Sequence, residues 1–169
     1  APKSINWYRD KIREFGKPGA LDLIRDGRRT TRPSAFNLNM FVYDPKYKKT
    51  LPYYDTFPLV LPLERYSDGF LGLNFHYLPI PLRVRLLDKI NTIPEDNQYS
   101  ERDQLRISYA RASTIPMAKA VIKRYLYSHL KSQIRVVSPD EWVIAVLLPV
   151  QRFKKASTSK VYNETKKLF

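Results

Sequence analysis

Residues 36–78 read FNLNMFVYDPKYKKTLPYYDTFPLVLPLERYSDGFLGLNFHYL, and this stretch predicts a small antiparallel sheet. Over 36–43 every second residue forms one apolar face, which is typical of a strand with one buried side. An apolar run at 57–63 contains two prolines. Because proline donates no ladder hydrogen bond, this run predicts an edge or bulged strand. A tight turn at 67–69 then leads into a returning strand at 70–75. Three short strands joined by turns predict a curled sheet.

Helical spacing replaces this alternation after the sheet. Apolar residues recur at helical intervals over 82–90, and Pro94 ends the predicted helix. A cap at Ser100 predicts a second helix that reaches about residue 112. The most regular helical pattern covers 117–131, and a further short helix is predicted at 4–15.

Two later segments complete the predicted architecture. Residues 134–137 fit a short strand, whereas 140–150 fit a helix start and a strand equally well. The predicted fold class is α+β, with a small curled antiparallel sheet at about 36–78, flanking N-terminal and C-terminal helices, and extended basic arms. We expect three parts: a basic N-terminal helix and arm at 1–35, an α+β core at 36–150, and a basic tail at 151–169.

Positive charge is concentrated at the two ends of the chain. The 169 residues include 30 Lys and Arg against 16 Asp and Glu, which gives a formal net charge of +14. Residues 1–50 carry a net +7, residues 51–115 carry −1, and residues 116–169 carry +8. Basic blocks of this kind indicate contact with nucleic acid or with another polyanion. An acidic protein partner is the alternative.

The candidate binding residues follow from this charge distribution. One predicted patch lies in the N-terminal arm, a second on the helix expected at 117–131, and a third in the tail. Each patch is expected to contact DNA phosphates or an acidic partner. The residues are Arg28, Arg29, Arg32, Lys123, Arg124, Lys154, Lys155, Lys166 and Lys167.

Signals of catalysis are sparse in the sequence. The chain has no cysteine, and His76 and His129 belong to no metal-ligand or nucleophile spacing. A two-metal nuclease would need converging carboxylates, for which Asp55, Glu64, Asp68 and Asp88 are the central candidates. Turn-capping or surface roles explain these carboxylates better. The sequence therefore predicts a protein that is not an enzyme and uses no cofactor or metal.

Aromatic residues are abundant and several stand beside cations. Tyr43 and Tyr47 flank Lys46, and Tyr125 follows the pair Lys123 and Arg124. Tyrosines in such positions stack on bases in proteins that bind single strands. Core packing and anchoring at protein interfaces are the alternative, which we favour for most of them.

Several blocks of the sequence resemble a known family. They are LPYYDTFP at 51–58, GFLGLNFHYLP at 69–79, KRYLYSHL at 123–130, DEWVIAVLLPVQRFKKA at 140–156 and VYNET at 161–165. In these blocks the chain resembles small virion-associated proteins of T-even-like tailed phages. The resemblance implies a head-completion protein that protects the ends of packaged linear DNA. Small neck, tail and baseplate proteins of the same phages are the alternative.

Charge and resemblance together predict a non-enzymatic structural protein of a tailed-phage virion that contacts packaged DNA or its end through basic termini. The alternative is a tail, neck or baseplate subunit whose basic arms bind acidic neighbouring subunits. Expected partners are other virion proteins and double-stranded DNA, within a larger symmetric assembly. No apolar run approaches the roughly 18 residues of a membrane helix, so no membrane partner is expected. The expected location is the virion, after synthesis in the host cytoplasm.

Overall fold

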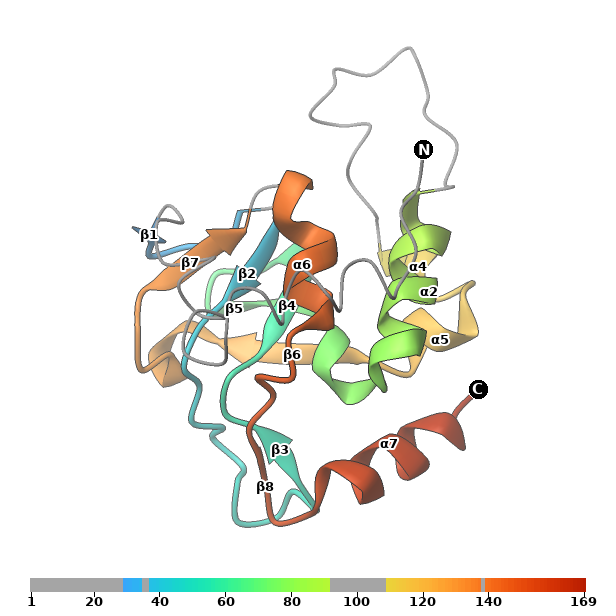
Figure 1. The fold of residues 1–169 in the computed structure, drawn as a ribbon. Helices are drawn as coiled ribbons and strands as arrows, with labels where there is room; N and C mark the ends of the chain where they lie inside the picture. The colour runs from blue at the N-terminus through green and yellow to red at the C-terminus, as the bar shows by residue number, and fades with distance from the viewer. Residues whose placement is uncertain (1–28, 35–36, 92–108, 138) are drawn as a thin grey trace.

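The computed structural model describes residues 29–34, 37–91, 109–137 and 139–169 (Figure 1). The helix predicted at 4–15, Arg28, Phe36 and most of the helix predicted at 100–112 lie outside the described residues. Within them, short helices pack against an antiparallel sheet whose strands do not follow the chain order, which confirms the α+β class.

The main sheet has six strands in the order β1-β7-β2-β4-β5-β6, and all neighbours are antiparallel. The strands are β1 (Arg29–Thr30), β2 (Leu38–Met40), β4 (Leu59–Arg65), β5 (Gly69–Asn74), β6 (Ile122–Leu126) and β7 (Ile134–Val137). A separate pair joins β3 (Tyr54–Asp55) to β8 (Phe153–Lys154). The predicted strands at 70–75 and 134–137 are thus confirmed.

The proline-containing strand β4 is central, so of the two predicted alternatives, an edge strand or a bulged strand, the bulged strand is confirmed. It lies between β2 and β5, and its register shifts between Pro62 and Glu64. The predicted bulge is therefore present, and it accommodates Pro62 within the sheet. Leu59, Leu61 and Leu63 face the main core.

The prediction of one helix over 117–131 is wrong, because the segment contains a short helix, a strand and a 3₁₀ turn. Helix α5 (Pro116–Lys119) ends there early, β6 follows, and a 3₁₀ turn, η2 (Tyr127–His129), ends the segment. β6 pairs along β5, where Gly69 permits a close approach: a Cβ at Gly69 would lie 1.9 Å from the Tyr125 carbonyl oxygen. Pairing with a distant strand overrides the local helical spacing. Lys123 and Arg124 consequently lie on a strand.

Helices cover one face of the main sheet. Helix α2 (Ile80–Asn91) confirms the helical pattern at 82–90 and packs against α6 (Trp142–Leu147). For residues 140–150 the sequence fitted a helix start and a strand equally well. The structure has a helix there, α6, preceded by the 3₁₀ turn η3 (Pro139–Glu141). The helices bury leucines of β4 together with Leu86 and Val146. α4 (Tyr109–Ala112) contributes Ala112 to the same core.

An aromatic cluster occupies the other face of the sheet. Phe41, Tyr43, Phe70 and Tyr125 are buried there with ring centroids 5.0–6.0 Å apart. Most of these pairs are edge-to-face, an arrangement that aromatic quadrupoles favour. Tyr43 and Tyr125 are therefore core residues.

The C-terminal residues fold back on the molecule as β8 and α7 (Thr158–Lys166). Ser157 caps α7 by accepting a hydrogen bond from the Lys160 amide at 3.1 Å. Val161 is buried in the main core, so α7 packs against the rest of the molecule. Among the described residues, no helix is long and apolar enough to cross a membrane.

Candidate nucleic-acid interface

The two described N-terminal candidates are both exposed. Arg29 lies in β1 opposite Arg135 of β7. Arg32 follows β1, and its guanidinium carbon lies 4.3 Å from the ring centroid of Tyr127. The tyrosine ring holds Arg32 at the surface without neutralising its charge.

The two candidates on β6 meet at one pocket but differ in their partners. Arg124 pairs with Asp68 at 2.6 Å and stacks over Tyr66 at 4.2 Å. The Lys123 ammonium lies 4.2 Å from the ring centroid of Tyr77. Lys123 has no carboxylate partner among the residues that the structure describes.

The C-terminal candidates lie elsewhere. Lys154 is exposed in β8, whereas Lys155 adopts a positive φ of 72°. The Lys155 ammonium donates to the carbonyl oxygens of Lys48, Lys49 and Leu51, so it stabilises the loop before β3. Lys166 and Lys167 lie at the exposed end of α7, where Lys167 pairs with Glu164 at 3.1 Å.

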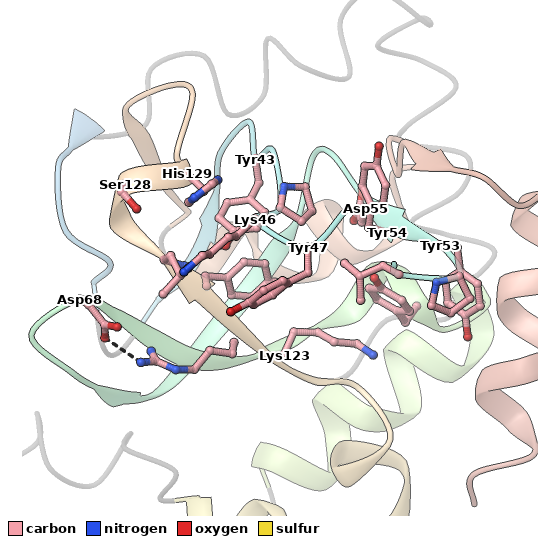
Figure 2. A pocket seen from close by; sticks show the side chains of 17 residues that line it. Tyr43, Lys46, Tyr47, Tyr53, Tyr54, Asp55, Asp68, Lys123, Ser128 and His129 are labelled. Carbon is pink, nitrogen blue, oxygen red and sulfur yellow. Dashed lines mark hydrogen bonds and ion pairs between the residues drawn. The ribbon is translucent and has the colours of Figure 1, made fainter. Parts of the chain in front are cut away.

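A cavity of about 790 Å³ lies between the loop that precedes β3 and strand β6. We call it the tyrosine pocket, because six of its lining residues are tyrosines: Tyr43, Tyr47, Tyr53, Tyr54, Tyr77 and Tyr125. Lys46, Lys123 and Arg124 add cationic groups to the lining. Figure 2 shows Tyr47 and Lys123 near its middle, with Tyr53 toward one end and Asp68 and His129 toward the other. Its volume lies within the usual range of ligand sites.

The protonation states in the tyrosine pocket favour an anionic ligand. Burial raises the pKa of Tyr43, Tyr53, Tyr77 and Tyr125, so these hydroxyls stay neutral at physiological pH. Burial lowers the pKa of Lys123, because its charge is poorly solvated. An anion beside Lys123 would stabilise the charged ammonium.

A second cavity, of about 340 Å³, contains three arginines and is called here the arginine cleft. These are Arg29, Arg135 and Arg152. Arg29 and Arg135 are direct cross-strand neighbours, and like charges in that position repel each other. Arg152 lies over the Phe57 ring at 5.3 Å. Within the described part of the chain, no carboxylate pairs with any of the three. A phosphate would relieve this repulsion.

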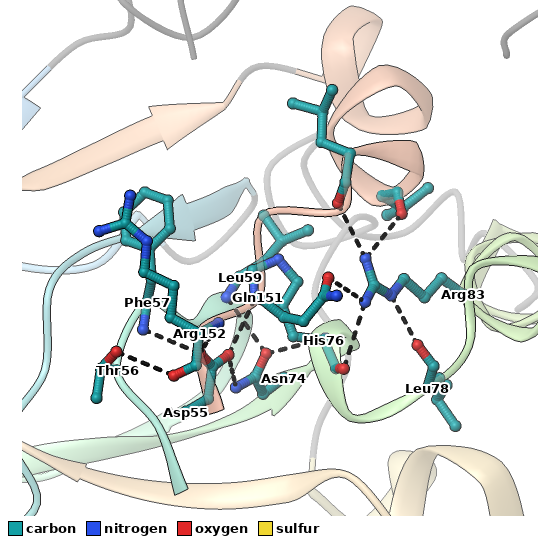
Figure 3. Close-up of polar contacts among 12 residues, drawn as sticks. Asp55, Thr56, Phe57, Leu59, Asn74, His76, Leu78, Arg83, Gln151 and Arg152 are labelled. Carbon is teal, nitrogen blue, oxygen red and sulfur yellow. Dashed lines mark hydrogen bonds and ion pairs between the residues drawn. The ribbon is translucent and has the colours of Figure 1, made fainter. Parts of the chain in front are cut away.

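Asp55 belongs to a buried hydrogen-bond network (Figure 3). Its Oδ2 accepts hydrogen bonds from His76 Nδ1 at 2.9 Å and from the side-chain amide nitrogen of Asn74 at 3.1 Å. Its Oδ1 accepts from the backbone amides of Phe57 at 2.9 Å and Arg152 at 3.1 Å. Burial alone would raise the pKa of Asp55, but the contacts with His76, Phe57 and Asn74 hold it below its ordinary value. Asp55 is therefore an ionised structural group.

The nuclease hypothesis finds no metal site in the described residues. Asp55 and Asp68 both line the tyrosine pocket, yet Asp55 is fully hydrogen-bonded and Asp68 pairs with Arg124. Glu64 accepts a hydrogen bond from the Tyr66 hydroxyl at 2.9 Å, and Asp88 is exposed on α2. No group of three or more His, Asp or Glu side chains that could hold a metal occurs in the described ranges.

Sequence reasoning anticipated part of the lining of the tyrosine pocket. It associated Tyr43 and Tyr47 with Lys46, and Lys123 with Tyr125, and the tyrosine pocket contains all five residues. It missed Tyr53, Tyr54 and Tyr77, although the first two stand in the LPYYDTFP block. It also missed Arg135 and Arg152, which only strand pairing and the return of the C-terminal segment bring beside Arg29.

Comparison with models of protein families finds one family that matches almost the entire chain. The family model described as "Phage T4 terminal DNA protecting protein" matches residues 1–168. No curated protein and no solved structure matches the chain.

Proposed function

The chain belongs to the phage T4 terminal DNA protecting protein family, and on that premise we propose that it binds the ends of linear duplex DNA. In this proposal the protein is a non-enzymatic structural component of the virion. It neutralises phosphates near the DNA end. Its binding does not depend on the DNA sequence, because phosphate contacts position a protein without specifying bases.

The observation that carries the contact with DNA in this proposal is the arginine cleft. Three arginines line it, two of them as direct cross-strand partners, and none has a carboxylate partner among the described residues. Such an arrangement costs stability unless an anion binds. Planar guanidinium groups match phosphate geometry, and the cleft therefore suits a DNA backbone.

The family also supports the setting of the proposal. A terminal DNA protecting protein acts on phage DNA, so we infer a location in the particle after synthesis in the host cytoplasm. We infer that the protein acts in head completion. We also infer that its neighbours are other virion proteins in a symmetric assembly. Asp55 supports the non-enzymatic role, because its oxygens are already engaged in structural hydrogen bonds.

Binding to linear and circular duplex DNA of equal length tests the proposal. We expect binding that prefers the linear form and protects its ends from exonuclease at about 150 mM salt, where the Debye length is roughly 8 Å. Weak binding that is equal on both forms and erased by salt is the behaviour of any strongly basic protein. That result would contradict the proposal and favour a neck, tail or baseplate subunit with acidic neighbours.

Removal of the three cleft charges tests the carrying observation. The triple variant Arg29→Gln, Arg135→Gln and Arg152→Gln should bind DNA more weakly and flatten the dependence of log K on log salt. The slope should change by about 0.9 for each phosphate that the variant no longer neutralises. The matched control is Lys48→Gln, Lys119→Gln and Lys160→Gln, which removes three exposed charges outside the cleft. Equal slopes in the two variants would contradict the assignment.

A further inference from the structure

We propose that the tyrosine pocket receives the terminal nucleotide of the DNA end, with its base stacked against Tyr47 and its phosphate between Lys46 and Lys123. This inference rests on the proposed function and supplies what the arginine cleft lacks. Phosphate contacts along a backbone bind circular and linear DNA alike. Selection of an end needs a site that an interior nucleotide enters less readily.

The aromatic lining provides both an exposed face and a fixed floor. Tyr47 lines the pocket and exposes 63% of its surface. Beneath it, Tyr43 and Tyr125 are held edge-to-face at 5.0 Å, and the Tyr43 hydroxyl accepts a hydrogen bond from the Leu126 amide at 2.9 Å. The floor is therefore rigid, and Tyr47 is free to stack on an incoming base. Any base can stack, so the site needs no sequence preference.

Two of the three cations that line the pocket, Lys46 and Lys123, form no ion pair with a carboxylate among the described residues. Lys46 is exposed, with its ammonium 5.4 Å from the Tyr47 ring centroid. Lys123 contacts the Tyr77 ring and has no carboxylate partner in the described residues. Arg124 is already paired with Asp68 at 2.6 Å, so it contributes little net charge. A nucleotide phosphate fits this balance, since it brings one strong anion to two unpaired ammonium groups.

The geometry of the ligand explains why an end is preferred. An interior nucleotide must unpair and leave the stack on both sides before it can enter a pocket. A terminal nucleotide is stacked on one side only, so its entry costs less. The pocket volume of about 790 Å³ accommodates a ligand of nucleotide size. A bound terminal nucleotide would also be withheld from an exonuclease.

The test uses the full chain and duplex DNA that carries the fluorescent base 2-aminopurine either at the terminal position or in the interior. We expect binding to change the fluorescence of the terminal probe and to leave the interior probe unchanged.

Tyr47→Ala and Lys123→Gln should each reduce the preference for linear over circular DNA about tenfold. Tyr109→Ala and Lys119→Gln are the matched controls. Tyr109 is 42% exposed and Lys119 is exposed, and neither lines the pocket.

The outcomes separate this inference from the function on which it rests. Wild-type protein that selects ends without a change in the terminal probe would overturn the inference alone. Retained end preference in both pocket variants would do the same. Wild-type protein without any preference for ends would overturn the proposed function and this inference with it. Thermal unfolding of each variant shows whether weaker binding reflects a loss of fold.

Discussion

At the scale of single residues, His76 shows how burial fixes a protonation state. Its Nδ1–H donates to Asp55, and its Nε2 is buried without a hydrogen-bond partner among the described residues. A protonated ring would place an unsatisfied N–H at Nε2. Burial lowers the pKa of His76, and the nearby Arg83 charge adds to that effect, while Asp55 opposes it. His76 is therefore neutral in the folded protein at physiological pH.

The lowered pKa of His76 predicts that stability falls as the pH drops below about 6.5. In this range His76 binds a proton in the unfolded chain but not in the folded chain. The free energy of unfolding therefore decreases with falling pH. The greatest slope for one proton is about 1.4 kcal/mol per pH unit. Urea denaturation at several pH values between 7.5 and 5 measures this slope. The depressed pKa of Asp55 adds a further loss at more acidic pH.

Two histidine variants assign the slope to its source. His76→Asn keeps an N–H near the position of Nδ1 but cannot titrate, so it should flatten the dependence over this range. His129→Asn is the matched control, since His129 Nδ1 contacts the backbone oxygen of Asp44 at 2.8 Å and takes no part in the Asp55 network. A slope that disappears in the His129 variant instead would contradict the prediction.

At the scale of elements, Arg83 connects helix α2 to the C-terminal part of the chain. It is 0% exposed, and its guanidinium donates to the carbonyl oxygens of Val146 at 3.3 Å and Leu148 at 3.1 Å. It also donates to Gln151 Oε1 at 3.0 Å (Figure 3). A further hydrogen bond joins it to the Tyr162 hydroxyl at 2.9 Å. One side chain thus joins α2, the end of α6 and α7.

Removal of this connection should be strongly destabilising. Arg83→Met keeps the apolar stem but leaves several buried oxygens without a donor, which should lower the free energy of unfolding by about 3–5 kcal/mol. Arg85→Met is the control, because Arg85 lies on the same helix and is exposed. Urea denaturation compares the two variants. A similar small decrease in both would show that the Arg83 hydrogen bonds contribute little.

The same elements show what sequence can predict here. The helix at 82–90 and the strand at 70–75 depend on patterns within a single segment, and both predictions are confirmed. The segment 117–131 carries apolar residues that suit a helix and a strand, and pairing with β5 decides between them. For β4 the prolines predicted an edge or a bulge without deciding between them, because the neighbours of a strand cannot be read from its own residues.

At the scale of the whole molecule, the candidate site depends on long-range assembly. The tyrosine pocket combines a loop near residue 47 with β6, some 75 positions later in the sequence. The arginine cleft likewise needs β1, β7 and the chain before β8. Charge counting locates the basic segments, but it cannot tell an engaged ammonium such as Lys155 from an unpaired one such as Lys123.

The basic N-terminal patch should contribute affinity without selecting ends. Replacing Arg28, Arg29 and Arg32 by glutamine should weaken binding to linear and circular DNA by the same factor, because contacts with phosphates do not distinguish the two forms. The salt slope should flatten by about 0.9 for each phosphate that is no longer neutralised. Fluorescence anisotropy over a salt series measures both quantities for the two DNA forms. An unchanged slope would exclude the patch from the interface, whereas a selective decrease on linear DNA would place it at the DNA end.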